Sequence, residues 1–243
     1  MGFSTEARLP LWTPVLLAIG YFAAGLLSYW FSSSSGAFAE SVFIHEGFGL
    51  AVTLLVGRMA WGSVFAGHLA LSLYQGMAPG LALVVALGNL TVVVLLSSLL
   101  QRLKFRCQMD TPRDYLLLVL GVTLISQPVA RLLALATMRT AMHADITLET
   151  VVEVFKFMWL DESVCQILVA TCILSGVEVL RRHRPVSFWL TLLLATGLLV
   201  LVLAQLLLVP DYQWLHPLHV LSIVYLLVMI VAAVFELFGA AVA

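Results

Sequence analysis

Long apolar stretches separated by short polar segments run along almost the whole chain. A helix of about 20 apolar residues crosses the hydrocarbon core of a bilayer and satisfies its own backbone hydrogen bonds there. The pattern predicts eight such helices, at about 11–31, 42–57, 60–76, 79–101, 114–135, 150–178, 186–208 and 214–238. We therefore expect an all-α integral membrane protein in which residues 1–243 form a single transmembrane domain. The second and third segments are short and are joined by a few residues around Arg58, which predicts a tight helical hairpin.

The composition supports the membrane class and narrows the function. Hydrophobic residues make up 62% of the chain and charged residues 10%, and the mean hydropathy is +1.08. These values lie far outside the range of soluble domains. The formal net charge of −1 gives no indication of nucleic-acid binding. The chain has no nucleophile elbow, Walker loop or dinucleotide-binding glycine motif, so we expect a protein that is not an enzyme.

Lys and Arg concentrate in alternate loops of this arrangement. Four follow the fourth predicted helix and three follow the sixth: Arg102, Lys104, Arg106 and Arg113, then Arg181, Arg182 and Arg184. Arg8 and Arg58 lie on the same side. Because cytoplasmic loops retain positive charge, the pattern predicts that both termini face the cytoplasm. The alternative interpretation of the basic loops is a cytoplasmic anionic partner or a lipid headgroup.

Strongly polar residues also occur within the predicted helices, where an ionisable group is costly unless it is paired or hydrated. The candidates for a ligand-binding or polar pocket are His45, Glu46, Asn89, Arg131, Lys156, Trp159, Asp161, Glu162, His216 and His219. Chain direction places two groups at different depths. In the outward third of the membrane are His45, Glu46, Arg131, Glu153, Lys156, His216 and His219, and nearer the midplane are His68, Asn89, Trp159, Asp161 and Glu162. The sequence therefore predicts a polar pocket that faces away from the cytoplasm.

Spacing suggests partners within this set. Glu153, Lys156, Trp159 and Glu162 recur every three residues, which predicts that they share one face of a helix over 150–178. We expect Glu153 to pair with Lys156, and Arg131 to pair with Glu162 or Asp161.

Three interpretations of these polar residues remain open. They could neutralise one another and only fix the packing of the helices, or they could bind a small ligand or an ion. The third is a haem or metal site, for which His45, His68, His216 and His219 are weak candidates because histidine is the commonest metal ligand. No metal-binding motif supports that site, and the sequence does not identify a cofactor. The three cysteines have no metal-ligand spacing and are expected to be packing residues.

Several local patterns follow one another in residues 43–175. They are His45-Glu46-Gly47, then Gly57-Arg58 with Trp61 and Phe65-Ala66-Gly67, then Leu87-Gly88-Asn89, Arg113-Asp114 and Trp159-Leu160-Asp161-Glu162. In this order they resemble the first class of bacterial membrane-associated sensor domains, which stand at the N-termini of histidine kinases and diguanylate cyclases. The resemblance implies a similar number of spans, a role in signal transduction and a location in the bacterial cytoplasmic (inner) membrane.

Two positions depart from the family's pattern. His45 stands where the family usually has proline, and Asp161-Glu162 stands where a Gly-Asp pair is expected. The chain also ends at Ala243, soon after the last predicted helix. We therefore expect a sensor-like module that acts through a separate membrane or signalling protein. The alternatives are a structural or accessory subunit of a membrane complex, and a redox protein with histidine-bound haem or metal.

Overall fold

The computed structural model describes residues 10, 12–34, 43–109, 111–141, 145, 147–153, 155 and 159–181. The chain divides into two compact units, Met1–Ser175 and Gly176–Ala243, and the described part of the second unit is the last turns of one helix. The predicted helices at 186–208 and 214–238 lie outside the described residues, as do Lys156, His216 and His219.

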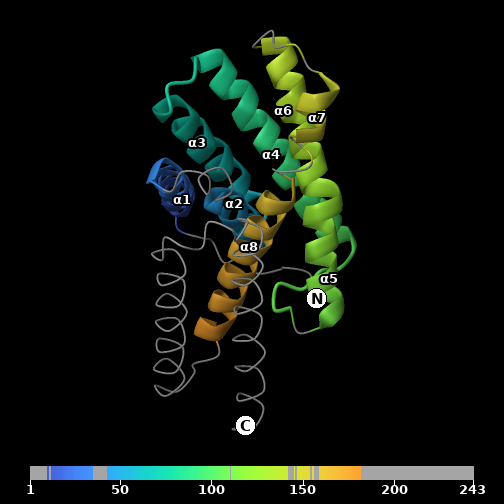
Figure 1. Ribbon diagram of the computed structural model, residues 1–243. Coiled ribbons are helices and arrows are strands. Elements are labelled where there is room, and N and C mark those ends of the chain that lie inside the picture. The colour runs from blue at the N-terminus through green and yellow to red at the C-terminus, as the bar shows by residue number, and fades with distance from the viewer. Residues whose placement is uncertain are drawn as a thin grey trace, which may run out of the picture. The chain divides into compact units, whose positions relative to one another are not determined.

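Helices follow one another through the whole described part of the chain, which contains no strand, so the predicted all-α class is confirmed there (Figure 1). The helices are α1 (Thr13–Ser34), α2 (Ile44–Val56), α3 (Met59–Tyr74), α4 (Pro79–Arg102), α5 (Pro112–Gly121), a π-helical segment η2 (Val122–Ser126), α6 (Gln127–Ala141), α7 (Leu148–Glu153) and α8 (Trp159–Arg181). A single apolar rod, Pro112–Thr140, runs through α5, η2 and α6.

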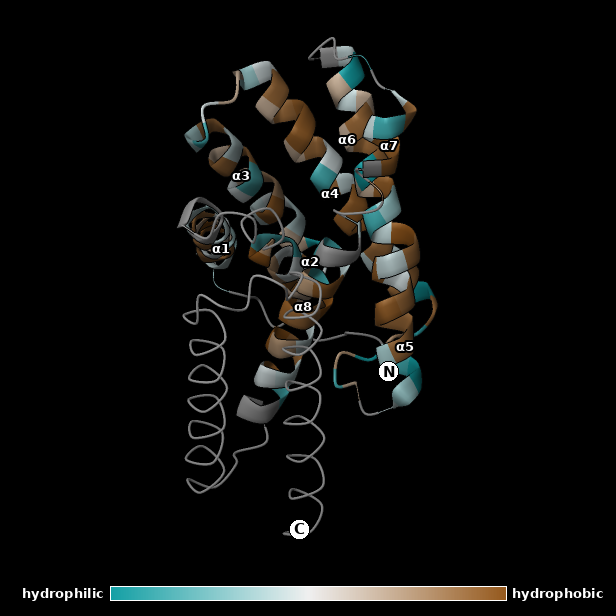
Figure 2. Ribbon diagram, in the orientation of Figure 1, coloured by the Kyte–Doolittle hydropathy of each residue, from teal (hydrophilic) through white to brown (hydrophobic). Residues whose placement is uncertain are grey.

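Within the residues that the structure describes, three stretches are long and apolar enough to cross a bilayer: Thr13–Trp30, Pro79–Arg102 and Pro112–Thr140. Figure 2 shows hydrophobic residues along most of α4, α5 and α6, interrupted by a few hydrophilic positions. Length and apolar character together identify a membrane protein. The neighbouring helices α2 and α3 have 13 and 16 residues and pack against each other across the turn at Gly57, whose φ of 72° is readily adopted by glycine.

The expected helix over 150–178 is described in two parts, α7 up to Glu153 and α8 from Trp159. Between them Phe155 is π-helical, and the other residues of 154–158 lie outside the described part of the chain. One continuous helix with Glu153 and Glu162 on the same face therefore stays a prediction.

Helix α2 lies between the two apolar cores of the first unit. One core joins α2 to α4, α5 and α8 and includes Leu50, Leu54, Leu96, Leu118, Ala170 and Leu174. The other joins α2 to α1, α3 and α4 and includes Tyr21, Val52, Ala60, Val64 and Val93. Opposite faces of one short apolar helix are thus buried, which agrees with its apolar character all round.

Glycines bring α2 and α3 close to their neighbours. A Cβ atom on Gly47 would lie 2.5 Å from the Cβ of Val169 in α8, and one on Gly67 would lie 2.9 Å from the Ala18 carbonyl oxygen in α1. Small residues at such contacts let helix backbones approach within a membrane. The Gly47 contact holds the start of α2 against the part of α8 that carries the polar residues described next.

Candidate functional site

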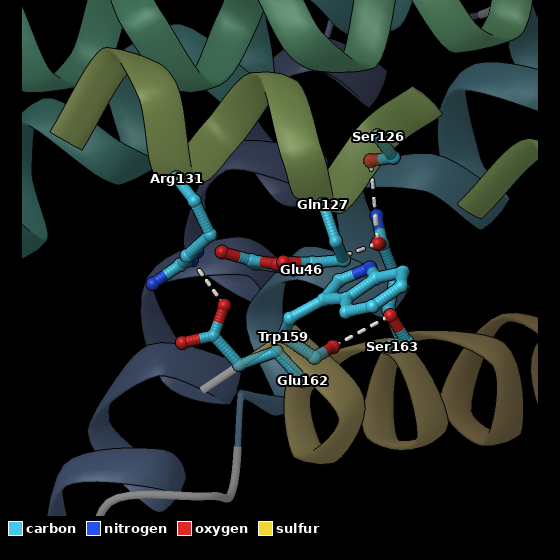
Figure 3. A network of polar contacts seen from close by, with 8 residues as sticks. Glu46, Ser126, Gln127, Arg131, Trp159, Glu162 and Ser163 are labelled. Atoms are coloured by element: carbon cyan, nitrogen blue, oxygen red, sulfur yellow. Dashed lines mark hydrogen bonds and ion pairs between the residues drawn. The ribbon is translucent and has the colours of Figure 1, made fainter. Parts of the chain in front are cut away.

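Two polar contacts connect α6 and α8 one helical turn apart. Gln127 Nε2 donates a hydrogen bond to Gln166 Oε1 at 2.9 Å, and the Arg131 guanidinium forms an ion pair with the Glu162 carboxylate (Figure 3). In each helix the two residues are four apart, so they lie on the same face. Since the residue numbers rise along α6 as they fall along α8, the two helices run antiparallel here.

The Arg131–Glu162 pair is deeply buried: the side chains are 10% and 0% exposed. A lone charge at membrane depth is costly, and each member of the pair compensates the other. The sequence predicts Glu162 or Asp161 as the partner of Arg131, and the structure shows that the partner is Glu162. Asp161 lies in α8, but its side chain is outside the described part of the structure.

A third helix, α2, also contributes to this site, through Glu46. Its Oε2 atom accepts a hydrogen bond of 2.8 Å from Gln127 Nε2. Ser126 Oγ also donates to Gln166 Oε1, at 3.3 Å. We call Glu46, Ser126, Gln127, Arg131, Glu162 and Gln166 the Gln127 cluster. It connects α2, α6 and α8.

One atom of this cluster is an unpaired acceptor. Both hydrogens of the Gln127 amide are used by Glu46 and Gln166, whereas Gln127 Oε1 is buried without a hydrogen-bond partner. Gln127 is 0% exposed, and leaving a buried acceptor unpaired costs roughly 1–3 kcal/mol. Glu46 is only partly buried, so the cluster reaches from the core towards a more accessible position.

The Gln127 cluster adjoins the π-helical segment η2. Trp159 Nε1 donates a 2.7 Å hydrogen bond to the carbonyl oxygen of Thr123, and Ser126 at the end of η2 contacts Gln166. Single π-helical turns inside α-helices are rare and occur frequently at functional sites. The first turns of α8 are therefore hydrogen-bonded to the π-helical segment η2, which lies between α5 and α6.

A second polar group lies on the other side of α2 and consists of Tyr21, His45, His68 and Asn89, the Tyr21 cluster. Asn89 Nδ2 donates to the Tyr21 hydroxyl at 2.6 Å and lies 3.1 Å from His68 Nδ1, and the Tyr21 hydroxyl lies 2.9 Å from the same nitrogen. The Tyr21 hydroxyl and the Asn89 amide both face His68 Nδ1. A neutral His68 ring with its proton on Nε2 would accept hydrogen bonds from them at that atom.

His45 completes the Tyr21 cluster through its ring. The ring centroid lies 5.5 Å from that of Tyr21 and 5.7 Å from that of His68. His45 Nδ1 is 3.4 Å from Ser28 Oγ, and Ser28 also accepts from the backbone N–H of Ile44 while it donates to the Ala24 carbonyl oxygen. Ser28 thereby fixes the first turn of α2 to α1.

The sequence predicts one pocket, but the structure divides its residues between these two adjacent clusters. His45 and Asn89 belong to the Tyr21 cluster, whereas Glu46, Arg131 and Glu162 belong to the Gln127 cluster and Trp159 flanks it. The physical reason is that consecutive residues of an α-helix project about 100° apart, so His45 and Glu46 leave α2 in different directions. His45 was predicted to lie closer to the outer surface than His68 and Asn89. In the structure the His45 ring is adjacent to the His68 ring, and His68 contacts Asn89.

A metal site gains no support within the described residues, where no three His, Cys, Asp or Glu side chains come together as ligands. Of the four histidines considered for this role, His45 and His68 are adjacent, and the other two lie outside the described residues.

Sequence reasoning missed Tyr21, Gln127 and Gln166 as site residues. Tyr21 is fully buried in α1, in a segment whose other polar residues are few. A signal was present for the glutamines: Gln127 precedes Arg131 by one turn, and Gln166 follows Glu162 by one turn. Because Arg131 and Glu162 were expected to pair, Gln127 and Gln166, one turn away on the respective helices, were candidates for a second pair.

Comparisons of the chain with protein-family models, with curated proteins and with solved structures found no match.

Proposed function

We propose that this protein is a non-enzymatic, sensor-like membrane module in which the Gln127 cluster binds a small ligand or an ion. The observation that carries the proposal is the unpaired, fully buried Gln127 Oε1 atom, positioned among ionisable side chains from three helices. Intramembrane ionisable groups mark functional sites by default. The resemblance to bacterial membrane-associated sensor domains supports the same class of function and a bacterial inner-membrane location.

The charges of the cluster indicate the kind of ligand. Glu46 and Glu162 are acidic, Arg131 is basic, and the ion pair uses Arg131 for Glu162. Glu46 receives a neutral amide hydrogen bond from Gln127. A cation or a hydrogen-bond donor could therefore interact with the Glu46 carboxylate and with the unpaired Gln127 Oε1 atom at the same time.

Binding would act on the packing of the helices. The same residues that would contact the ligand also hold α2, α6 and α8 together and adjoin η2. A ligand shifts a conformational equilibrium only by binding one packing better than another, and contacts shared among three helices provide such a difference. In this proposal a separate membrane or signalling protein reads the packing of the helices.

The second candidate is a structural subunit of a membrane complex, and the Tyr21 cluster favours it. There Asn89, Tyr21 and His68 direct their donors and acceptors at one another. Polar networks of this kind can specify helix packing without binding anything.

The experiment compares Glu46→Gln with the wild type, and uses Glu149→Gln, which changes an exposed acidic residue of α7, as the matched control. Thermal unfolding of the purified full-length chain is followed in mild detergent with NaCl, KCl or CaCl₂ against choline chloride at constant ionic strength. Proteins that copurify with each variant are identified by mass spectrometry.

A sensor-like module predicts a cation-dependent rise in unfolding temperature that Glu46→Gln abolishes and Glu149→Gln preserves, with the copurified partner unchanged. A structural subunit predicts that Glu46→Gln loses the partner or lowers abundance, with no cation dependence in any variant. Copurification that stays normal in all variants without any cation dependence would contradict the ion-binding form of the proposal.

A further inference from the structure

The loop between α4 and α5 has a backbone that only a well-fixed loop adopts. Lys104 and Met109 have backbone φ values of 56° and 51°, in the left-handed region that residues other than glycine rarely adopt. Each such residue costs roughly 1–3 kcal/mol and persists only where the surroundings impose it. The contacts of the loop show what imposes it.

Two buried side chains anchor the loop to the apolar core. Phe105 and Cys107 are 8% and 6% exposed and pack in the core that joins α2, α4, α5 and α8. The Cys107 thiol also contacts the Leu54 carbonyl oxygen in the last turn of α2, at 3.4 Å. The loop therefore lies beside the end of α2, just before the turn that carries Arg58.

Asp114 is the third anchor. It is 1% exposed, and its Oδ1 accepts a hydrogen bond from the backbone N–H of Arg106, while its Oδ2 accepts one from the Thr111 hydroxyl. Thr111 is the N-cap of α5, and its hydroxyl oxygen accepts from the Asp114 N–H. This arrangement is a variant of the capping box, with Pro112 at the first helical position. The start of α5 and the loop are thus held by the same carboxylate.

The basic side chains of this segment are directed outward. Those of Arg102, Lys104, Arg106 and Arg113 are all exposed. Arg113 also donates to the Leu103 carbonyl oxygen at 2.8 Å, which ties the beginning of α5 to the end of α4. Asp114, in contrast, is buried, and Asp110 lies outside the described residues. The fixed backbone of the loop therefore presents a group of exposed basic side chains.

Position identifies the surroundings of these charges. The loop connects Pro79–Arg102 to Pro112–Thr140, two of the stretches that are long enough to cross the bilayer, so it lies where the hydrocarbon core gives way to headgroups. Trp61, whose ring has the Arg58 guanidinium 5.7 Å from its centroid, follows the neighbouring turn, and tryptophan is enriched at this level of the membrane. Phosphate groups of lipids are the anions within reach of the exposed side chains.

We propose that the α4–α5 loop is a preformed site for the phosphate of an anionic phospholipid, with Lys104 and Arg106 as its principal contacts. Guanidinium groups bind phosphate through paired hydrogen bonds, and an ammonium binds it as a point charge. The fixed backbone sets the positions from which both side chains extend before the lipid arrives, which lowers the part of the entropic cost of binding that comes from ordering the loop.

The test measures how strongly the full-length protein prefers anionic lipid. The chain is reconstituted in nanodiscs of phosphatidylcholine with increasing phosphatidylglycerol, and the lipids that remain bound after mild delipidation are counted by native mass spectrometry. Lys104→Gln/Arg106→Gln should weaken phosphatidylglycerol retention about 25-fold, since each basic residue near the surface contributes roughly fivefold. Arg139→Gln removes one exposed charge outside the loop, at the far end of α6, and should weaken retention by no more than about fivefold.

A second variant separates a preformed site from simple charge attraction. Asp114→Ala removes the buried anchor and makes the segment more positive, so charge attraction alone predicts stronger retention. The proposal predicts weaker retention, because the loop loses the acceptor that fixes the Arg106 backbone.

Unchanged retention in Lys104→Gln/Arg106→Gln, or stronger retention in Asp114→Ala, would overturn the proposal. So would competition by millimolar inorganic phosphate that displaces phosphatidylglycerol completely, which would show a site for a free anion. Thermal unfolding of each variant in pure phosphatidylcholine identifies any variant that fails to fold. Where Lys104→Gln/Arg106→Gln fails in this way, the single variant Lys104→Gln replaces it, with an expected loss of about fivefold.

Discussion

His45 and Glu46 follow one another in α2, yet their side chains belong to different polar clusters. The His45 ring lies 5.5 Å from the ring of Tyr21, whereas Glu46 accepts a hydrogen bond from Gln127. The first turn of α2 is therefore attached on one side to α1 and on the other to α6. A movement of this turn would change both clusters, which makes α2 the structural connection between them.

The first prediction concerns the buried ion pair. Arg131→Gln and Glu162→Gln should each lower the free energy of unfolding by about 3–5 kcal/mol, because each leaves the opposite charge buried without its partner. The double variant should cost clearly less than the sum of the two. The measurement is a double-mutant cycle of unfolding by sodium dodecyl sulfate in mixed micelles.

Arg139→Gln is the matched control for this cycle, since Arg139 is an exposed arginine of the same helix. Its effect should stay within about 0.5 kcal/mol. Costs of the two single variants that simply add in the double variant would show that the pair does not couple α6 to α8.

The second prediction concerns the close approach of α2 to α8. Gly47→Ala places a methyl group 2.5 Å from the Val169 Cβ and 2.9 Å from the Gln166 carbonyl oxygen. A backbone atom cannot yield as a flexible side chain does, so the helices must separate at a cost of about 1–3 kcal/mol. Gly62→Ala has nothing within 4 Å and should be neutral or slightly stabilising. Thermal unfolding of both variants in one detergent decides the point, and equal effects would contradict the assigned contact.

Much of the helical organisation follows from local apolar pattern. Apolar length alone predicts α1 and α4 to within a few residues at each end, and the turn around Arg58 predicts the α2–α3 hairpin. The π-helical segment within Pro112–Thr140 was not predicted, because hydropathy measures the transfer of side chains to lipid and is insensitive to backbone geometry.

Pairing by charge was the strongest signal for the site. Arg131 needs an anion at membrane depth, and only a few acidic residues lie within the apolar segments, so Glu162 could be named as one of two partners. Neutral residues such as Tyr21 and Gln127 give no comparable signal, because an amide or a hydroxyl finds partners of many kinds. Which side of α2 a residue faces depends on how the neighbouring helices pack, and local sequence does not specify it.

The third prediction tests the attachment of α8 to η2. Trp159→Phe keeps the aromatic packing but removes the donor to the Thr123 carbonyl oxygen, so hydrogen exchange of backbone amides in 122–127 should become faster. The loss of stability should be about 1 kcal/mol, the net contribution of an ordinary hydrogen bond. Trp12→Phe, at a position that is 59% exposed, is the control and should leave exchange in η2 unchanged. Identical exchange in both variants would show that the indole does not restrain the π-helical turn.

The last prediction concerns the Tyr21 cluster and the proton of His68. Because the Tyr21 hydroxyl and the Asn89 amide both direct hydrogens at Nδ1, His68 should be neutral with its proton on Nε2. Nitrogen NMR of selectively labelled histidine in detergent micelles distinguishes the two ring nitrogens. Tyr21→Phe should then cost about 1 kcal/mol while Asn89 still donates to His68, whereas Tyr29→Phe, at a half-exposed tyrosine of the same helix, should cost less than about 0.5 kcal/mol. A proton found on Nδ1 would contradict this arrangement, since the Asn89 amide would have to be reversed to accept it, and His68 would become a donor within the cluster.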